Sequence, residues 1–344
     1  MSRLSATIIS GLSRPHFPFI LLESSLVQSC LPVLRAFVNN RDATTHVLLV
    51  CLLFPPSALA GDPAREGLHV VDMTAQVPGY SETSPDLAGS ILNAVKQVPD
   101  GPLTVIIDSA DVLCADLESP SKSYTLIATL LSGVIARPKP SRLILHFATH
   151  SSLRDLVLTP RLSPTLAHVI AHPPALLKHL ATEQLLPPPP ASTPDRFWPV
   201  FAPLSARTWE VERIVLGSGC VGLSDDGETV LQVVTRGRGK NVERDLDGWT
   251  LDGACSLSEL DSLKGILEDK GKPQWAEVSK ATPRHLTSFN LNLTPEQRES
   301  RAKVPLPYAH KGTKDAAQSS GAILYDPDSA DDIDDDDPDE DLDI

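Results

Sequence analysis

The sequence predicts an α/β fold: a mostly parallel β-sheet with helices on both faces and antiparallel strands added after it. Two observations carry this prediction. From Phe17 to about Gln184, short and nearly continuous apolar runs alternate with amphipathic stretches, which is typical of parallel strands joined by helices. Beyond a proline-rich break at 187–195 the pattern becomes that of antiparallel strands, and we expect these to extend the same sheet.

Apolar runs predict the strands of the first part of the sheet. The segment FPFILL (17–22) predicts a buried strand, and 46–54 and 67–73 predict two more. A helix is expected over 25–40 because its apolar residues recur every three or four positions, at Val27, Leu31, Leu34 and Val38. The segment 85–98 opens with Pro and Asp, as a helix does at its start.

The same alternation continues to the proline-rich break. The run LTVIIDSADVL (103–113) predicts a strand that carries Asp108. The remaining elements follow the same two patterns, with helices expected at 121–137 and 174–186 and strands at 141–150 and 166–172. The run PPPPASTPD (187–195) continues neither a helix nor a central strand, so we expect a loop there.

Three antiparallel strands are expected next, over 207–217, 228–237 and 240–251, with Asp226-Gly227 as a hairpin turn. Little periodicity remains after them. We therefore assign residues 1–251 to one domain and 252–344 to a largely disordered tail.

The charge of the chain is concentrated at one place. The segment 326–344 holds 12 acidic residues and no basic one, which leaves 32 acidic against 30 basic residues in the rest of the chain. A nearly neutral body is unlike a globally basic nucleic-acid-binding protein, although it allows local basic patches.

The cysteines and the apolar runs bear on the cellular location of the protein. Five scattered cysteines without a CxxC pair fit reduced thiols, so we expect a protein of the cytoplasm and nucleus. We expect no signal peptide, because Gly, Arg, His and Pro interrupt the apolar residues near the start. The longest apolar run, 47–54, is far too short to cross a membrane. We expect no membrane association.

The sequence offers no catalytic, cofactor or metal site. A phosphate-binding loop needs glycines, a lysine and a hydroxyl after the first strand, but the turn reads LLESSLVQSC and brings Glu23, which repels phosphate. Asp108 stands where a metal-binding acid of a nucleotide site would fall, and without that loop we interpret it as structural or interfacial. His168 and His172 are four residues apart, yet no HExxH pattern joins them, so strand-end histidines are favoured over zinc ligands. Gly217-Ser218-Gly219-Cys220 has no assignable base and reads as a glycine-rich loop.

A compact basic segment, RGRGK (236–240), is the candidate nucleic-acid site. Its glycines let the backbone conform, while Arg236, Arg238 and Lys240 supply cations that suit phosphate groups. The alternative is a solvated hairpin tip, which composition alone favours.

Several of these segments together resemble the fifth subunit of the Elongator complex, in a fungal version. The most specific is SFNLNLTPEQRESRAKVPLPY followed by ILYDPDSADDIDDDDPDEDL; others are FILLESSLVQSCLPVLRAF, LTVIIDS and VLQVVTRGRGKNVERDLDGW. The likeness runs in order along most of the chain and is thinnest around 55–85 and 187–206.

The resemblance implies a RecA-like fold without nucleotide motifs. It also implies a heterohexameric ring built with the fourth and sixth Elongator subunits, a ring that binds tRNA and supports modification of the wobble uridine, U34, by the third subunit. The chain is then a non-catalytic scaffold partnered by the remaining subunits as well, and Arg236, Arg238 and Lys240 become fair candidates for tRNA phosphate contacts. Two alternatives stay open: a degenerate ATPase-like domain that binds nucleotide by an atypical loop, and a stand-alone interaction protein with an acidic tail.

Spaced apolar residues in the tail predict a docking segment over 287–308. Phe289, Leu291 and Leu293 alternate as on a strand added to a sheet edge, while Leu306 and Tyr308 stand in an extended proline-containing stretch. We expect this segment to bind another subunit or the chain's own domain, and the acidic end, 326–344, to stay disordered.

Overall fold

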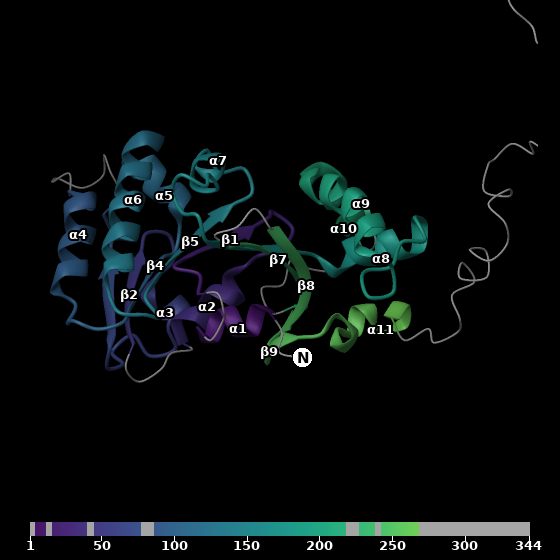
Figure 1. The fold of residues 1–344 in the computed structure, drawn as a ribbon, viewed down its shortest axis with the longest axis horizontal. Coiled ribbons are helices and arrows are strands. Elements are labelled where there is room, and N and C mark those ends of the chain that lie inside the picture. Colours follow the sequence, from purple (N-terminus) through teal and green to yellow (C-terminus); the bar gives the residue numbers. More distant parts are fainter. Residues whose placement is uncertain are drawn as a thin grey trace, which may run out of the picture. The chain divides into compact units, whose positions relative to one another are not determined.

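The computed structural model describes residues 4–11, 16–39, 45–76, 86–217, 227–237 and 242–267. The strands in this part of the chain form a single sheet with the order β3-β2-β4-β5-β1-β6-β7-β8-β9. The strands of its parallel part are β1 (Phe19–Ser24), β2 (His46–Cys51), β3 (Leu68–Asp72), β4 (Leu103–Ile107), β5 (Arg142–Ala148) and β6 (Leu166–His172). Three antiparallel strands extend it, β7 (Thr229–Arg236), β8 (Val242–Thr250) and β9 (Gly253–Cys255). This topology confirms the predicted α/β fold class, a mostly parallel sheet covered by helices whose antiparallel strands belong to the same sheet (Figure 1).

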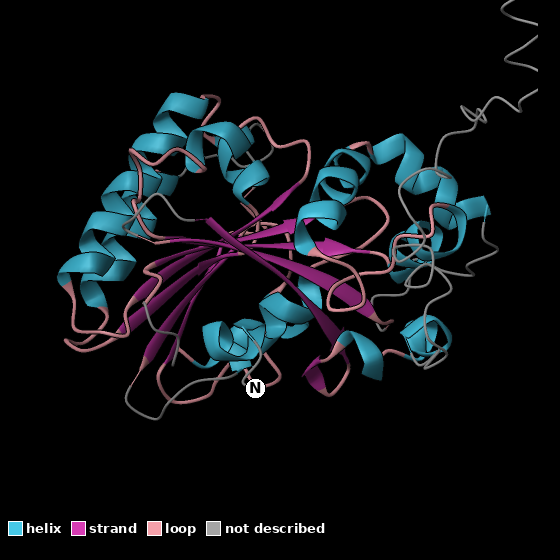
Figure 2. Cartoon of the chain, turned by 45° about the vertical axis from the view of Figure 1, so that its right-hand side comes forward, coloured by secondary structure: helices cyan, strands magenta, loops and turns pink. Residues whose placement is uncertain are grey.

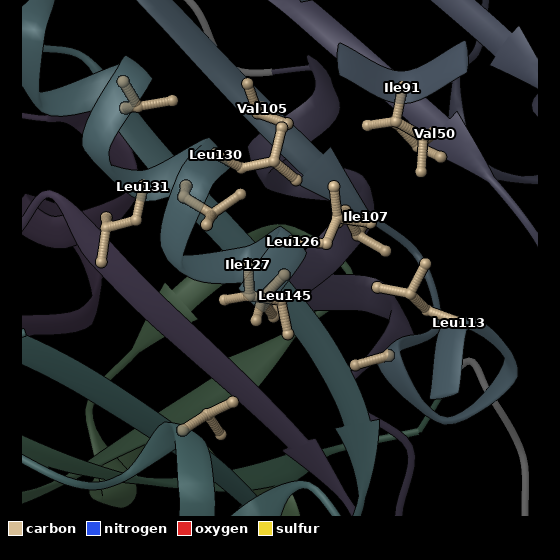
Figure 3. Packing of buried hydrophobic residues seen from close by; sticks show 14 of the residues in the cluster. Val50, Ile91, Val105, Ile107, Leu113, Leu126, Ile127, Leu130, Leu131 and Leu145 are labelled. Atoms are coloured by element: carbon tan, nitrogen blue, oxygen red, sulfur yellow. The ribbon is translucent and has the colours of Figure 1, made fainter. Parts of the chain in front are cut away.

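One face of the parallel strands is covered by α4 (Leu87–Gln97), α5 (Ala110–Asp116), α6 (Pro120–Ala136) and the short α7 (Arg154–Val157). The longest of these, α6, begins with Ser119 as N-cap, whose hydroxyl accepts the N–H of Lys122, and with Pro120 at its first position. Leu126, Ile127 and Leu130 of α6 are buried in the same core as Val105 and Leu145 of the strands, and Figure 3 shows this packing. We call this side of the sheet the α7 face.

The opposite face is covered by α1 (Leu4–Ser10), α2 (Leu31–Asn39) and α3 (Pro56–Leu59), which share a second core with the alternate residues of the same strands. We call it the α1 face. Figure 1 shows α1, α2 and α3 on the side of the sheet away from α4, α6 and α7. Because both faces are covered, the central strands are apolar at most positions on both sides, which is why their sequences show little alternation.

A third group of helices packs around the end of β6 and the start of β7. It consists of α8 (Pro174–Glu183), α9 (Pro194–Ala206), α10 (Thr208–Gly217), a 3-10 turn η1 (Leu257–Glu259) and α11 (Asp261–Leu267). Phe197 and Phe201 of α9 stack at 5.1 Å between ring centroids, and both are fully buried. Figure 2 shows this helix group beside the strands of the antiparallel end of the sheet.

Helix α1 is held at both ends by charged side chains from distant strands. The Asp247 carboxylate accepts the backbone N–H of Ser5 at 2.8 Å, near the helix start. At the other end the Arg142 guanidinium donates to the carbonyls of Ile8 at 2.7 Å and Ile9 at 3.0 Å. An acid at the N-terminus and a base at the C-terminus both complement the helix dipole. The helix therefore ties β8 to β5 across the α1 face.

Three predicted elements need correction. Residues 207–217 were expected to form a strand, but Thr208–Gly217 is helix α10, in which Val211 and Val215 share one buried side. Helix α9 was missed because it follows a proline run and contains Pro199 and Pro203. The predicted strand over 103–113 ends at Ile107, and α5 begins at Ala110.

The ordered domain also continues past the predicted boundary at 251. Strand β9, the η1 turn and α11 follow, and Leu257, Leu260 and Leu263 are buried in the third core. Residues 268–344 lie outside the described part of the chain. No helix among the described residues is long and apolar enough to span a bilayer.

Candidate functional site at the carboxyl edge of the sheet

The loop after β1 occupies the place of a phosphate-binding loop, but its polar groups bond to one another. The N–H of Ser25 donates to the carbonyl of Gln28 at 2.9 Å, and the N–H of Gln28 donates to the Ser25 hydroxyl at 3.0 Å. The N–H of Cys30 donates to the Ser24 hydroxyl at 2.8 Å. Backbone N–H groups that would cradle phosphate in a glycine-rich loop are thus used to close this one.

Glu23, at the end of β1, is buried between two basic side chains. Its Oε2 lies 2.8 Å from Nε2 of His168 on β6, and the Nε of Arg154 on α7 lies 3.2 Å from both carboxylate oxygens. The Glu23 side chain is 2% exposed, that of His168 is 6% and that of Arg154 is 35%. Burial alone raises the pKa of Glu23, but the hydrogen bond from His168 and the charges of His168 and Arg154 outweigh it and hold the pKa below its usual value. An internal carboxylate therefore fills this position.

Asp108, after β4, is also satisfied within the protein. Its carboxylate accepts the backbone N–H groups of Leu52 at 2.8 Å, Leu53 at 2.9 Å and Phe54 at 2.8 Å. Burial raises the pKa of Asp108, although these three donors and the nearby His146 oppose the shift. The carboxylate fixes the turn after β2, which agrees with the structural role expected from the sequence. Among the described residues no group of three or more His, Cys, Asp or Glu side chains is placed to hold a metal ion.

Ser24 and His146 form a hydrogen-bonded pair that the sequence did not reveal. The Nδ1 of His146 lies 2.7 Å from the carbonyl oxygen of Asp108, which only accepts, so Nδ1 carries the proton. The Ser24 hydroxyl, 2.7 Å from Nε2, is then the donor. Burial lowers the pKa of His146, which keeps the ring neutral near pH 7. This chain connects β1, β5 and β4, and the Ser24 oxygen also accepts the Cys30 N–H, so the pair stabilises the loop after β1.

His172, the other strand-end histidine, bonds to a neutral partner. Its Nε2 donates to Oε1 of Gln232 on β7 at 2.9 Å, and its ring meets that of Phe201 edge-on at 5.2 Å between centroids. Burial lowers the pKa of His172 to about 4. His168 and His172 thus bond to different partners, as expected of strand-end histidines.

The structure places part of the candidate phosphate site. Arg236 ends β7, and its guanidinium donates to the carbonyls of Leu158 at 2.8 Å and Ser163 at 2.8 Å, in the segment between α7 and β6. This side chain anchors a loop through its two Nη atoms. Arg238 and Lys240 lie outside the described residues, and so do the predicted docking residues Phe289, Leu291, Leu293, Leu306 and Tyr308.

A separate cavity of about 490 Å³ lies on the α1 face, away from the carboxyl edge. It is bounded by α1, α2 and the turn between β8 and β9, with Arg35, Asn39, Trp249 and Asp252 among its walls. Nothing in the sequence pointed to it. Its residues play no part in the Glu23 network.

Sequence reasoning also missed Arg154. It stands in a four-residue helix without periodicity, and 131 residues separate it from the carboxylate that it bonds. No local pattern signals such a pair. Glu23, in contrast, was recognised as an obstacle to phosphate from its place after the first strand.

Comparison with known proteins shows that part of this chain is similar to a protein family. The model of the family "Elongator subunit Iki1" matches residues 225–326. Elongator complex protein 5 of Danio rerio is 45% identical over 74 residues, which cover 20% of this chain and 24% of that protein. The Rattus norvegicus protein of the same name is 40% identical over 79 residues, covering 21% of this chain and 24% of the relative. A solved KaiC-like protein from Pyrococcus horikoshii is 11% identical, with a TM-score of 0.37 over 69% of this chain and 88% of its own.

The matched segment takes in β7, β8, β9 and α11, together with residues beyond 267 that the structure does not describe. The alignments with the two named relatives span only about a quarter of the length of those proteins, 24% in each. The family-model match, residues 225–326, covers the C-terminal part of this chain. It also contains two of the motifs that first suggested the family, VLQVVTRGRGKNVERDLDGW and SFNLNLTPEQRESRAKVPLPY. The resemblance of this chain to the Elongator subunit 5 family is therefore confirmed, and residues 225–326 carry it.

Proposed function

We propose that this protein is a non-catalytic scaffold subunit of an Elongator complex. In this proposal it forms a heterohexameric RecA-like ring with the fourth and sixth subunits, contacts the remaining subunits, and works in the cytoplasm and nucleus. The ring binds tRNA and supports modification of the wobble uridine by another subunit. The family match supports the Elongator role.

The absence of catalysis is supported above all by the internal occupation of the nucleotide position. A nucleoside triphosphate needs backbone N–H donors, a lysine and a metal-binding acid at the ends of the parallel strands. Here the loop after β1 bonds to itself, Glu23 is paired with Arg154, and Asp108 holds three backbone N–H groups. These groups, which lie where phosphate or Mg²⁺ would bind, already have partners inside the protein.

The tRNA contact is assigned to the tip of the β7–β8 hairpin. Arg238 and Lys240 follow Arg236 in a glycine-rich segment, and both residue types bind phosphate. Arg236 itself serves the fold, because two backbone carbonyls hold its guanidinium. The proposed phosphate contacts of the tip are therefore those of Arg238 and Lys240.

The segment 287–308 is proposed to dock onto another Elongator subunit or onto this domain, with the acidic end of the chain left free. Its spaced apolar residues gain from a partner surface that offsets the entropy lost on ordering. Its place inside the matched family segment, up to residue 308, supports a role shared with the relatives.

Affinity purification of the tagged full-length protein, followed by mass spectrometry, tests the proposal. We expect five other Elongator subunits in stoichiometric amounts. Recovery of the chain without them would overturn it and favour a stand-alone interaction protein, while a purified chain that binds ATP would favour the degenerate ATPase-like domain.

A further inference from the structure

Arg154 is held in one orientation by a buried carboxylate, and the outer part of its guanidinium is left for another ligand. Its Nε is the atom that bonds Glu23, at 3.2 Å from each oxygen. Neither Nη forms a hydrogen bond to any described residue; Nη1 makes a long ion pair, at 3.8 Å, with Asp155, whose side chain is 96% exposed. A guanidinium anchored through Nε offers its two Nη groups as a preorganised fork, which suits two oxygens of a phosphate.

The segment that carries Arg154 is fixed at its other end as well. Leu158 is the C-cap of helix α7, and its carbonyl accepts a hydrogen bond from Arg236, as does that of Ser163. Arg236 is also the last residue of β7, directly before the basic hairpin tip. Arg154 and Arg236 therefore both contact or belong to the segment between β5 and β6.

The basic and acidic side chains of strand β8 lie on opposite faces of the sheet. Arg244 is opposite Val234, which is opposite His168, so Arg244 lies on the α7 face, two strands or roughly 10 Å from His168. Residues of opposite parity point to the other side. Asp247 reaches helix α1 there, and Glu243 and Asp245 share its parity. The exposed base of β8 is thus on the face that bears Arg154, and its acids are on the other.

We propose that Arg154 and Arg244 bind backbone phosphates of RNA on the α7 face, with Glu23 as the residue that positions Arg154. The inference depends on the tRNA binding proposed above and extends it from the hairpin tip to the body of the domain. Arg161, in the segment between α7 and β6, is a further exposed cation. The arrangement favours a chain of phosphates over an isolated anion because its cations come from separate elements, α7 and β8.

The test measures binding of a fluorescent tRNA transcript by the complex assembled from this full-length chain and the fourth and sixth Elongator subunits, across a range of salt concentrations. We expect Arg154→Ala to weaken binding about tenfold, the loss typical of a charge-assisted hydrogen-bond pair, and to flatten the log–log salt slope by about one unit. Arg154→Lys keeps the charge but loses the fork, and we expect it to lose most of the affinity. Arg207→Ala is the matched control, because this exposed arginine is paired with Glu210, on the third helix group.

The direction in which Glu23→Gln changes RNA affinity gives a second test. This change makes the protein more positive by one charge, so a purely electrostatic effect would tighten RNA binding. Loss of the positioning carboxylate instead weakens it, and the weakening disappears in an Arg154→Ala background, where there is no guanidinium to position. Thermal melting of each assembled complex, well above the assay temperature, shows that folding is retained.

The outcomes separate this inference from the proposed function. Normal affinity and slope for both Arg154 variants, beside weakened binding by the Arg238→Ala/Lys240→Ala variant, would overturn the inference alone. Tighter binding by Glu23→Gln would overturn the positioning role. If the wild-type complex did not bind tRNA at all, the proposed RNA-binding function would fail together with the inference.

Discussion

The Glu23 carboxylate lies 2.8 Å from the His168 ring and 3.2 Å from the Arg154 guanidinium, at the end of a strand where related architectures place a phosphate. The partners come from α7 and β6, at positions 131 and 145 residues after Glu23 in the chain. The contact serves two purposes, because it fills the nucleotide position and fixes the arginine beside it.

The acid sensitivity of the protein is expected to depend on Glu23. The pKa of this carboxyl is lowered in the folded protein, so its contribution to stability is complete above the unfolded value, about 4.3, and is lost as the pH falls through the folded value. The free-energy difference between wild type and Glu23→Gln, measured by urea unfolding, is expected to be large at pH 7 and to shrink below about pH 4. Asp155→Asn is the control, since that side chain is 96% exposed. A difference that stayed constant from pH 7 to pH 3 would contradict the assignment.

His172 is expected to remain neutral to an unusually low pH. Burial lowers its pKa to about 4, while in the unfolded chain it titrates near 6.5. The unfolded state therefore takes up a proton first, and the folded state loses stability as the pH falls from about 6.5 to about 4. NMR titration of the imidazole signals checks the midpoint. A titration midpoint of His172 near 6.5 would contradict the burial of its ring against Phe201.

The purified chain is expected not to bind ATP. Glu23 and the self-bonded loop after β1 leave no N–H cradle and no lysine for phosphate. Calorimetric titration with Mg-ATP should give no heat of binding. Micromolar affinity would contradict this prediction and favour the degenerate ATPase-like domain.

Two arginines of one basic motif are expected to behave differently. Arg236→Ala removes donors from the carbonyls of Leu158 and Ser163, and we expect it to lower the free energy of unfolding by about 1–3 kcal/mol. Arg238→Ala/Lys240→Ala should leave stability unchanged and flatten the salt slope of tRNA binding by about one unit per lost contact. Equal effects of the two variants on stability would show that the motif acts only in folding.

Helix α1 is expected to detach when its acidic partner is removed. Asp247→Ala leaves the buried N–H of Ser5 without an acceptor, at a cost of about 1–3 kcal/mol. Asp245→Ala, two residues earlier on an exposed part of the same strand, should cost less than about 0.5 kcal/mol. Hydrogen exchange of residues 4–11 should accelerate in the first variant only. The same experiment on the assembled complex reports on the tail, where slow exchange over 287–308 and fast exchange beyond 326 would support docking.

The sequence was most informative where burial acts on a whole strand. Continuous apolar runs located β1, β2 and β6 because both faces of each are covered. Helix α10 was mistaken for a strand because Trp209, Val211 and Val215 also fit an alternating pattern, although Trp209 is 61% exposed in the helix. Only its packing against α8 and α9 decides between the two periods.

The candidate site was predictable only in part. The position of Glu23 at the end of the first strand was enough to exclude a phosphate-binding loop. That conclusion did not require the identity of the residues that bond Glu23. Those partners lie 131 and 145 residues away, so Arg154 and His168 are brought to it by strand order and not by spacing. In the same way the second role of Arg236 depends on the loop before β6, which the RGRGK motif does not reveal.

The hydrogen bonds that Asp247 and Arg142 make to helix α1 have a consequence for synthesis on the ribosome. Ser5 precedes Asp247 by 242 residues, which at ordinary elongation speeds is a delay of roughly 10 to 50 seconds. During that interval Ile8 and Ile9, buried in the finished domain, have no completed sheet to pack against. The nascent chain therefore carries the apolar residues of α1 before the carboxylate that accepts the Ser5 N–H has been made. Such a segment is a natural substrate for ribosome-associated chaperones, and the domain closes after almost all of it has been made.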